Sequence, residues 1–223
     1  MRIKTITTLL CLLFTLFSTA TASEINFRIT NVAGGRFTVS WRSESKCIGK
    51  LDIYNMGNKF INSFIDDRGE QFFDIIHYIT VDGLKDNTSY QFSIKSDKKI
   101  FDNDGYYFSV TTGPTLVPMG SIQPAGKILL SNKGTPASGS IVYITISNSN
   151  EKSALLSTLV DNNGYWYIDL INARTFDDQN LYKISSQDEL DILVLGTKGN
   201  AKYKGQIYDN QGGKKLYPNI YIK

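Results

Sequence analysis

The sequence predicts an all-β protein built from two tandem β-sandwiches that a proline-rich linker joins. Three observations support this fold class. Segments rich in β-branched and aromatic residues alternate with period two along most of the chain, turn residues separate them, and no stretch shows a helical period over three turns. In addition, Pro114, Pro118 and Pro124 fall together between two sets of such segments.

The first 22 residues predict a secretory signal peptide. Arg2 and Lys4 precede an uncharged apolar run from about Ile6 to Phe17, and Ala20-Thr21-Ala22 has the small-x-small pattern of a cleavage site. No second apolar run approaches the roughly 20 residues that a spanning helix needs. We therefore expect cleavage near Ala22 and a mature chain without a membrane span, secreted or extracytoplasmic: in the periplasm, at the cell surface or outside the cell.

The charge and cysteine content of the mature chain exclude several classes of protein. Removing Arg2 and Lys4 leaves 24 − 2 = 22 basic residues against 21 acidic ones. Without a Lys/Arg block, this balance predicts neither a nucleic-acid partner nor an anionic membrane surface. Cys11 lies in the signal peptide, so Cys47 is the single thiol of the mature chain and no internal disulfide can form.

Residues 23–114 form the first set of strand segments. In RFTVSWR, Phe37, Val39 and Trp41 fall on one face and Thr38 and Ser40 on the other. The expected strands of this set are INFRIT, RFTVSWR, KLDIY, KFINSF, IIHYITV, YQFSIK and YYFSVTT. About seven short strands with turns between them are typical of a β-sandwich.

Residues 115–123 read as the linker, because proline cannot donate to a sheet ladder and stiffens an extended path. Strand signals resume over residues 124–223, which predicts a second all-β domain. Its expected strands are GKILL, SIVYITIS, ALLSTLV, YWYIDL, ELDILVLG, AKYKGQIY and PNIYIK. We expect residues 23–115 and 120–223 to fold as separate units.

The first domain resembles the fibronectin type III family. Trp41 in FTVSW stands where that family places a core tryptophan, and VDGLKDNTSYQFSI looks like the corner between its fifth and sixth strands, with Leu84 six residues before Tyr90. The resemblance implies an immunoglobulin-like β-sandwich in which the Tyr90 ring enters the core and its hydroxyl bonds to the preceding turn. The chain has no Arg-Gly-Asp triplet, so integrin adhesion is not implied.

The second domain more loosely resembles the carboxypeptidase regulatory-like or transthyretin-like sandwiches. The likeness lies in AGKILLSNKGTPASGSIVYITI, a glycine-led strand with a G-x-P turn and a paired strand, and in LSTLVDNNGYWYIDL, an acidic turn before an aromatic strand. It implies that Trp166, Ile168 and Leu170 face the core while Tyr165 and Tyr167 point outward. The segment from Asn172 to Asp188 matches this pattern less well.

Three acidic tetrapeptides that end in glycine raise the question of calcium binding. They are DNDG from Asp102, DNNG from Asp161 and DNQG from Asp209. None has the ligand spacing, the glutamate at position twelve or the flanking helices of a helix-loop-helix calcium site. Asn, Asp and Gly tolerate positive φ, so we interpret the three segments as turns and expect no metal and no cofactor.

No residue pattern in the sequence predicts catalysis. His77 is the single histidine and lies in the apolar segment FFDIIHYITV, so we expect a partly exposed strand residue rather than a general base. A Ser-His-Asp or Cys-His arrangement would have to use His77 together with a serine or Cys47. We interpret Cys47 instead as a packed or semi-exposed thiol rather than a nucleophile, and it could still bridge two chains. Nucleophile-elbow and phosphate-binding glycine motifs are both absent from the sequence.

Outward tyrosines are the remaining candidates for binding. Tyr106 and Tyr107 follow one acidic turn, and Tyr165 and Tyr167 follow another. Such rings can stack on sugars or anchor a protein, although cross-strand packing is the commoner role. The sequence therefore favours a non-enzymatic binding, adhesion or scaffold protein of the cell envelope or extracellular space, with a protein or glycan partner. The alternative is a carbohydrate-binding or enzyme-accessory module that uses the tyrosines.

Overall fold

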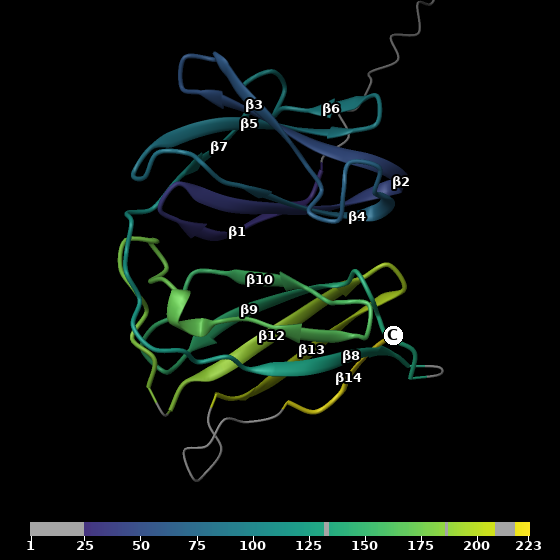
Figure 1. The fold of residues 1–223 in the computed structure, drawn as a ribbon, viewed down its shortest axis with the longest axis vertical. Coiled ribbons are helices and arrows are strands. Elements are labelled where there is room, and N and C mark those ends of the chain that lie inside the picture. The colour runs from purple at the N-terminus through teal and green to yellow at the C-terminus, as the bar shows by residue number, and fades with distance from the viewer. Residues whose placement is uncertain (1–24, 132–133, 186, 208–216) are drawn as a thin grey trace, which may run out of the picture.

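The computed structural model describes residues 25–131, 134–185, 187–207 and 217–223, and the regular secondary structure of these residues is almost entirely β-strand (Figure 1). The signal-peptide prediction and the DNQG segment at Asp209 lie outside the described residues. The first half contains β1 (Phe27–Ala33), β2 (Arg36–Asn55), β3 (Phe60–Ile65), β4 (Phe73–Val81), β5 (Ser89–Ser96), β6 (Lys99–Phe101) and β7 (Phe108–Thr111). The second half contains β8 (Ala125–Leu130), β9 (Ile141–Ser147), β10 (Leu156–Leu159), β11 (Tyr165–Tyr167), the 3-10 turn η1 (Leu170–Asn172), β12 (Glu189–Gly196), β13 (Gly199–Gln206) and β14 (Ile220–Ile222).

One long strand builds both layers of the first sandwich. We expected RFTVSWR and KLDIY to be separate strands, but both belong to β2, which is 20 residues long. The first part of β2 pairs with β1 and β4, and its second part, from Gly49 onward, pairs with β5 and β3. The sheet therefore curls on itself, and its two layers face each other (Figure 1). Apolar side chains from both layers form the core between them.

The core of the first sandwich confirms the two residues on which the fibronectin-like prediction depends. Trp41 is almost fully buried among Phe37, Leu51 and Phe92, as the period-two pattern requires. The buried Tyr90 ring lies in the same core, and its hydroxyl accepts a hydrogen bond of 2.9 Å from the backbone N–H of Lys85. The tyrosine thus ties the turn before β5 to the core.

The second half is also a sandwich, with one sheet in the order β10-β9-β12-β13 and another in the order β11-β8-β14. Trp166 and Leu170 are buried in its core and Tyr165 and Tyr167 point outward, as the alternation predicted, while Ile168 is partly buried. Between residues 172 and 188, the described residues (all but 186) form isolated bridges, such as Arg174 with Leu181, and no strand. The two halves together make an all-β chain of two immunoglobulin-like sandwiches joined by the proline-rich segment.

Turns form at both acidic tetrapeptides that the structure describes. The Asp161 carboxylate accepts backbone hydrogen bonds of 2.8 Å from Asn163 and from Tyr165, and Gly164 has φ +86°. This turn is not a hairpin, because β10 and β11 belong to different sheets. At the first tetrapeptide, the Asp102 carboxylate accepts a bond of 3.0 Å from the Gly105 N–H.

The two halves share a buried interface that the sequence analysis did not foresee. A third apolar cluster joins Ile76 and Tyr78 of β4 to Ile141 and Tyr143 of β9. Hydrogen bonds surround it: the Ser40 and Tyr143 hydroxyls are 2.8 Å apart, and the Tyr78 hydroxyl donates to the Ser157 carbonyl at 3.0 Å. Sheet β1-β2-β4 therefore packs face to face on the sheet that contains β9 and β10 (Figure 1). The domain limits 23–114, 115–123 and 124–223 stay a prediction.

Candidate functional site

A bulge in β2 creates the most distinctive chemical site of the molecule. Along the β2–β4 ladder, Arg42 pairs with Ile76 and the next pair is Cys47 with Asp74, so four residues of β2 oppose one of β4. These four residues, Ser-Glu-Ser-Lys, are polar and carry no β-branched side chain. The Ser43 hydroxyl donates to the Ser45 carbonyl at 2.7 Å and fixes the bulge.

His77 lies directly behind Cys47 and is completely buried, which corrects our expectation of a partly exposed residue. His77 pairs with Trp41 across β2 and β4, so the two side chains lie on the same face, and their rings stack at 4.8 Å. The tryptophan covers the imidazole and excludes solvent from it. His77 Nε2 lies 3.2 Å from Cys47 Sγ, and Cys47 is 3% exposed.

A buried carboxylate lies on the other side of the imidazole. Asp66 follows β3 and is 2% exposed, and its Oδ2 is 3.8 Å from His77 Nδ1. That separation is an ion-pair distance rather than a hydrogen bond. The imidazole therefore stands between a thiol and a carboxylate, in the order Cys47, His77, Asp66.

Arg68 keeps the Asp66 carboxylate ionised. Its Nε donates to Oδ1 at 2.7 Å and its Nη2 to Oδ2 at 2.9 Å, while the Tyr78 N–H donates to Oδ2 at 3.0 Å. Burial alone would raise the pKa of Asp66, but the hydrogen bonds and charge of Arg68, the neighbouring His77 and the Tyr78 N–H together outweigh it, and the pKa falls to about 2. The same guanidinium donates to the Gly139 carbonyl at 3.0 Å, so it also connects the two halves.

Gly49 makes room for this cluster. A Cβ atom at Gly49 would lie 2.6 Å from His77 Nδ1 and 2.7 Å from Trp41 Cζ2, closer than real Cβ contacts allow. The glycine is therefore required by the close approach of the two rings. Any larger residue would displace the imidazole from Cys47 or from Asp66.

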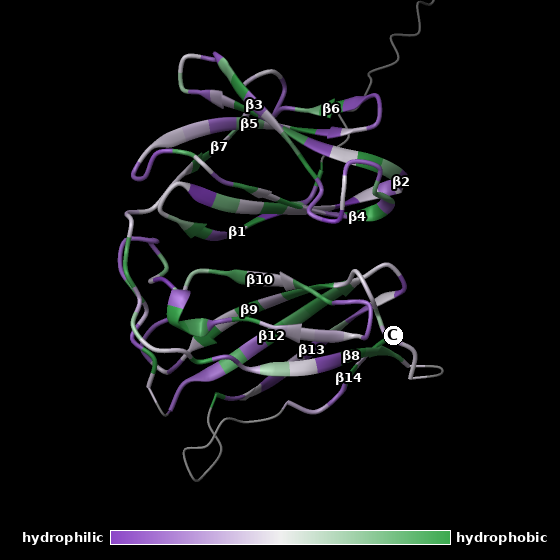
Figure 2. Cartoon of the chain, in the orientation of Figure 1, coloured by the Kyte–Doolittle hydropathy of each residue, from purple (hydrophilic) through white to green (hydrophobic). Residues whose placement is uncertain are grey.

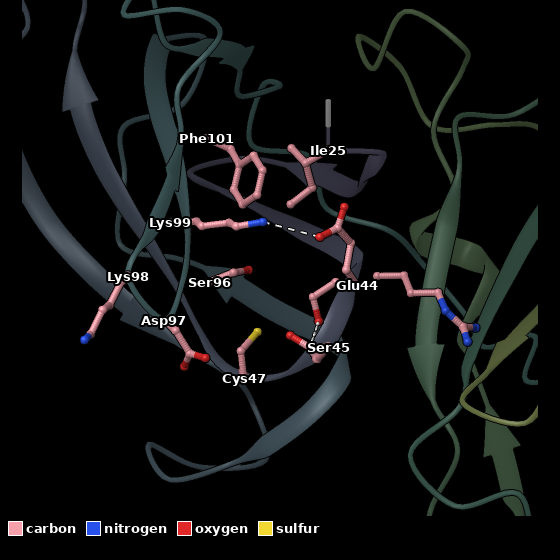
Figure 3. A pocket seen from close by; sticks show the side chains of 11 residues that line it. Ile25, Glu44, Ser45, Cys47, Ser96, Asp97, Lys98, Lys99 and Phe101 are labelled. Atoms are coloured by element: carbon pink, nitrogen blue, oxygen red, sulfur yellow. Dashed lines mark hydrogen bonds and ion pairs between the residues drawn. The ribbon is translucent and has the colours of Figure 1, made fainter. Parts of the chain in front are cut away.

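A cavity of about 560 Å³ opens in front of Cys47. Figure 3 shows the Cys47 sulfur pointing toward the space between Ser45 and Ser96. Lys99 and Glu44 form an ion pair of 3.3 Å at the rim, and the side chains of Ile25 and Phe101 form an apolar wall (Figure 3). The thiol thus lies at the floor of the pocket, and the buried imidazole lies behind it, outside the pocket lining.

Sequence reasoning raised a Cys-His arrangement of Cys47 with His77 but favoured a packed thiol and a partly exposed histidine, so it missed that the two side chains lie together. It did not consider Asp66, Gly49 or the polar bulge. The signals that could have found the cluster are the interruption of period two by Ser-Glu-Ser-Lys and a glycine in the interior of a strand segment. Chemically, the arrangement can hold a proton on either Sγ or Nε2 and stabilise the charged imidazolium through Asp66.

The exposed side of β3 is a second feature with functional potential. Among the residues that the structure describes, β3 pairs with β2 alone, so its other edge is unpaired there, and five of its six residues are exposed. Its sequence FINSFI carries no charge and no proline, and Phe60, Ile61 and Ile65 are 52%, 43% and 41% exposed. Figure 2 shows the apolar character of this strand at the rim of the first sandwich. Most natural edge strands carry charges or proline that discourage pairing.

The four candidate tyrosines have different environments. Tyr107 stacks on Tyr54 with ring centroids 4.5 Å apart, which is the packing role. Tyr106 and Tyr167 are exposed, and Lys127 Nζ lies 4.5 Å from the centre of the Tyr165 ring. Tyr165 and Tyr167 share the outer face of β11, whereas Tyr106 lies in the other half.

The described residues contain no group of three or more His, Cys, Asp or Glu side chains placed to hold a metal ion. Cys47 and Asp66 lie on opposite sides of the His77 ring, so these three cannot converge on one ion. Within the same residues, no helix has the length and apolarity to cross a membrane. The expected absence of metal and cofactor remains a prediction.

Comparison with known proteins identifies no family for this chain. No family model matches the chain, and no curated protein matches it. Among solved structures, it is similar to a two-domain fibronectin type III segment of chicken tenascin, at 10% identity over 81% of this chain and 96% of that chain, with a TM-score of 0.28.

Two other similar structures have comparable scores. The FN1–FN3 domains of chicken CNTN1 match at 10% identity over 78% of this chain, with a TM-score of 0.29, and this chain spans 61% of that structure. The pilus 2b backbone protein of group B streptococcus matches at 9% identity over 87% of this chain and 96% of its own, with a TM-score of 0.29. An enzyme, a beta-1,3-glucanase from Paenibacillus barengoltzii, is also among the matching structures. At these TM-scores none of them defines a function.

Proposed function

We propose that this chain is an exported, non-enzymatic binding or scaffold protein of the cell envelope or extracellular space, and that it binds a protein partner along β3. The observation that carries the proposal is the exposed, uncharged edge of β3. A free edge offers a row of backbone donors and acceptors, and an extended segment of another protein can pair with it. The partner segment is itself extended and uncharged, because a charge opposite Phe60 and Ile61 would be desolvated without a counter-charge.

The second half then acts as a rigid support for this surface. The buried interface fixes the first sandwich on the second, as a spacer or scaffold requires. We also propose that residues 124–223 are a carboxypeptidase regulatory-like or transthyretin-like sandwich. The predicted signal peptide, in this proposal, directs export of the chain.

Photo-crosslinking in the source organism tests the binding surface. A photoreactive phenylalanine analogue replaces Ile61 or, as a matched control, Phe176, which is more exposed and lies far from β3 in sequence. The proposal expects an adduct with another envelope protein from position 61 and none from position 176. If position 61 gives no adduct, the proposal that β3 binds a partner is wrong. An adduct of twice the chain mass would show instead that the chain associates with itself.

The outer face of β11 supports a second candidate function, carbohydrate binding. Tyr165 and Tyr167 are two residues apart on one strand face, and both rings are about half or more exposed. Two such rings can stack on a sugar chain. A glycan array distinguishes this function: Tyr167→Ala abolishes the signal if the face binds glycans, whereas the control Tyr106→Ala leaves it unchanged.

A further inference from the structure

We propose that Cys47 is a reactive thiol that exchanges with low-molecular-weight disulfides in the pocket, with His77 as its proton acceptor and Asp66 as a positioning residue. The inference stands apart from the β3 surface. It rests on three observations that are independent of one another: the cavity in front of Sγ, the Sγ–Nε2 distance of 3.2 Å, and the buried carboxylate behind the ring.

The cluster supplies the partners that a charge-separated thiol and imidazole need. A proton that moves from Sγ to Nε2 leaves a thiolate, which is the nucleophilic form of cysteine. The imidazolium then lies between that thiolate and the Asp66 carboxylate, which its hydrogen bonds to Arg68 keep ionised. Burial behind Trp41 strengthens both attractions because the local dielectric is low, and it also penalises the two charged forms through desolvation. The pH dependence of the reaction rate measures which effect is larger.

The exchange step balances without an additional oxidant. The Cys47 thiolate attacks one sulfur of the small disulfide, a new S–S bond forms to Cys47, and the S–S bond of the small molecule breaks. The leaving thiolate takes the proton held by His77 Nε2. Cys47 is oxidised to a mixed disulfide, and one half of the small disulfide is reduced to a thiol.

The pocket sets the class of disulfide. Three cationic side chains, Arg42, Lys98 and Lys99, line it together with the acids Glu44 and Asp97. The Arg42 guanidinium donates to the Gly196 carbonyl and Lys99 pairs with Glu44, so Lys98 is the cation that a bound carboxylate would meet. Ile25 and Phe101 provide an apolar wall. We infer a compact disulfide that carries a carboxylate, and 5,5′-dithiobis(2-nitrobenzoate) is a suitable probe because it combines an apolar ring with a carboxylate and releases a coloured thiolate.

The test compares reaction rates at pH 6 and pH 8 in the full chain carrying Cys11→Ser, in which Cys47 is the single thiol. The charged and titratable groups around Cys47 are Arg42, Glu44, Lys46, Asp66, Arg68, Asp74, His77, Asp97, Lys98 and Lys99. Carboxylates, lysines and arginines ordinarily titrate outside the range from pH 6 to pH 8. The ratio of the two rates therefore reports how the protonation of the thiol and imidazole changes between pH 6 and pH 8. Each ratio compares one protein with itself, so restricted access to the pocket cancels from it.

The matched control moves the thiol to an exposed site without a histidine, by Cys47→Ser together with Ser149→Cys in the same background. An exposed thiol with the usual pKa near 8.5 loses roughly 80-fold in rate between pH 8 and pH 6, as its thiolate fraction falls. We expect Cys47 to lose less than about tenfold over the same range, and His77→Gln to restore the steep dependence of the control.

Asp66→Asn distinguishes positioning from a merely structural role, because it should make the pH ratio steeper while Cys47 still reacts completely. If the wild-type ratio equals that of the exposed control, or if the folded chain does not react at all, the proposal is wrong. Should His77→Gln fail to fold, the comparison of the wild type with the exposed control still decides the question.

Discussion

Asn31 offers the sharpest test of whether the interface between the halves stabilises the protein. Its side chain crosses from β1 to β10: Oδ1 accepts from the Ser157 N–H at 2.9 Å, and Nδ2 donates to the Ser157 carbonyl at 3.0 Å and to the Tyr78 hydroxyl at 3.1 Å. Asn31 also has φ +54°, a conformation that glycine adopts without strain. Asn31→Gly therefore removes the bridge and leaves the backbone geometry intact.

The cost follows from which groups lose their partners. The Ser157 carbonyl still accepts from the Tyr78 hydroxyl at 3.0 Å, whereas the Ser157 N–H loses the Asn31 side chain. A buried unpaired N–H costs about 1 to 3 kcal/mol, and the other lost bonds contribute about 1 kcal/mol in sum. We expect Asn31→Gly to lower the free energy of unfolding by about 2 to 4 kcal/mol.

Urea unfolding measures this loss, and hydrogen exchange locates it. The matched control is Asn58→Gly, another asparagine with positive φ, +60°, in an exposed turn. It should change stability by less than about 0.5 kcal/mol. In Asn31→Gly, amide exchange should accelerate in β4 and β9, whose side chains form the shared cluster. Equal unfolding free energies for the two variants would refute a stabilising interface.

Four further predictions concern single residues. Tyr90→Phe should lower the unfolding free energy by about 1 to 3 kcal/mol in urea, because the Lys85 N–H loses its acceptor; no change would mean that water replaces the hydroxyl. Gly164→Val should lower the melting temperature, since φ is +86° and a Cβ would lie 2.9 Å from the Ile128 carbonyl oxygen. Millimolar calcium and excess chelator should give the same melting curve, whereas a true site at 100 times its Kd would add about 2.7 kcal/mol; a calcium-dependent rise that Asp161→Ala abolishes would contradict the turn interpretation. The pKa of Asp66 falls from its usual 3.8 to about 2, so ionised Asp66 contributes about 2 kcal/mol to the free energy of unfolding above pH 4. This contribution is lost as the pH falls toward 2. In acid titrations monitored by circular dichroism, Asp66→Asn should lack this pH-dependent loss of stability.

Local sequence patterns predicted the strands because each strand needs only its own alternation. In the segment around Trp166, the buried tryptophan lies between two outward tyrosines, as period two requires. The Tyr90 corner was also predictable, since its hydroxyl bonds to Lys85, five residues away in sequence. Relations between residues so close in sequence can be predicted from the sequence alone.

The interface was harder to predict because alternation distinguishes two faces without saying what covers them. In β9, Ile141 and Tyr143 are as buried as Val142 and Ile144 on the opposite face. A strand that is apolar on both faces indicates cover on both sides. That signal was present in IVYITI, but it does not name the partner, which is the β4 face with Ile76 and Tyr78.

The thiol cluster required three-dimensional information of another kind. Cys47, His77 and Asp66 come from three separate segments, and a bulge together with the curl of β2 brings them into line. Gly49 is the one residue whose identity reports this arrangement directly. A glycine in the interior of a strand costs about 0.5 to 1 kcal/mol relative to alanine, and Gly49 lacks the positive φ that would justify it. The stack of Trp41 on His77 is what the glycine makes possible. Glycine at position 49 lowers the stability of the strand, but it leaves room for the His77 ring. The buried imidazole can therefore lie 3.2 Å from Cys47, the only thiol among the described residues.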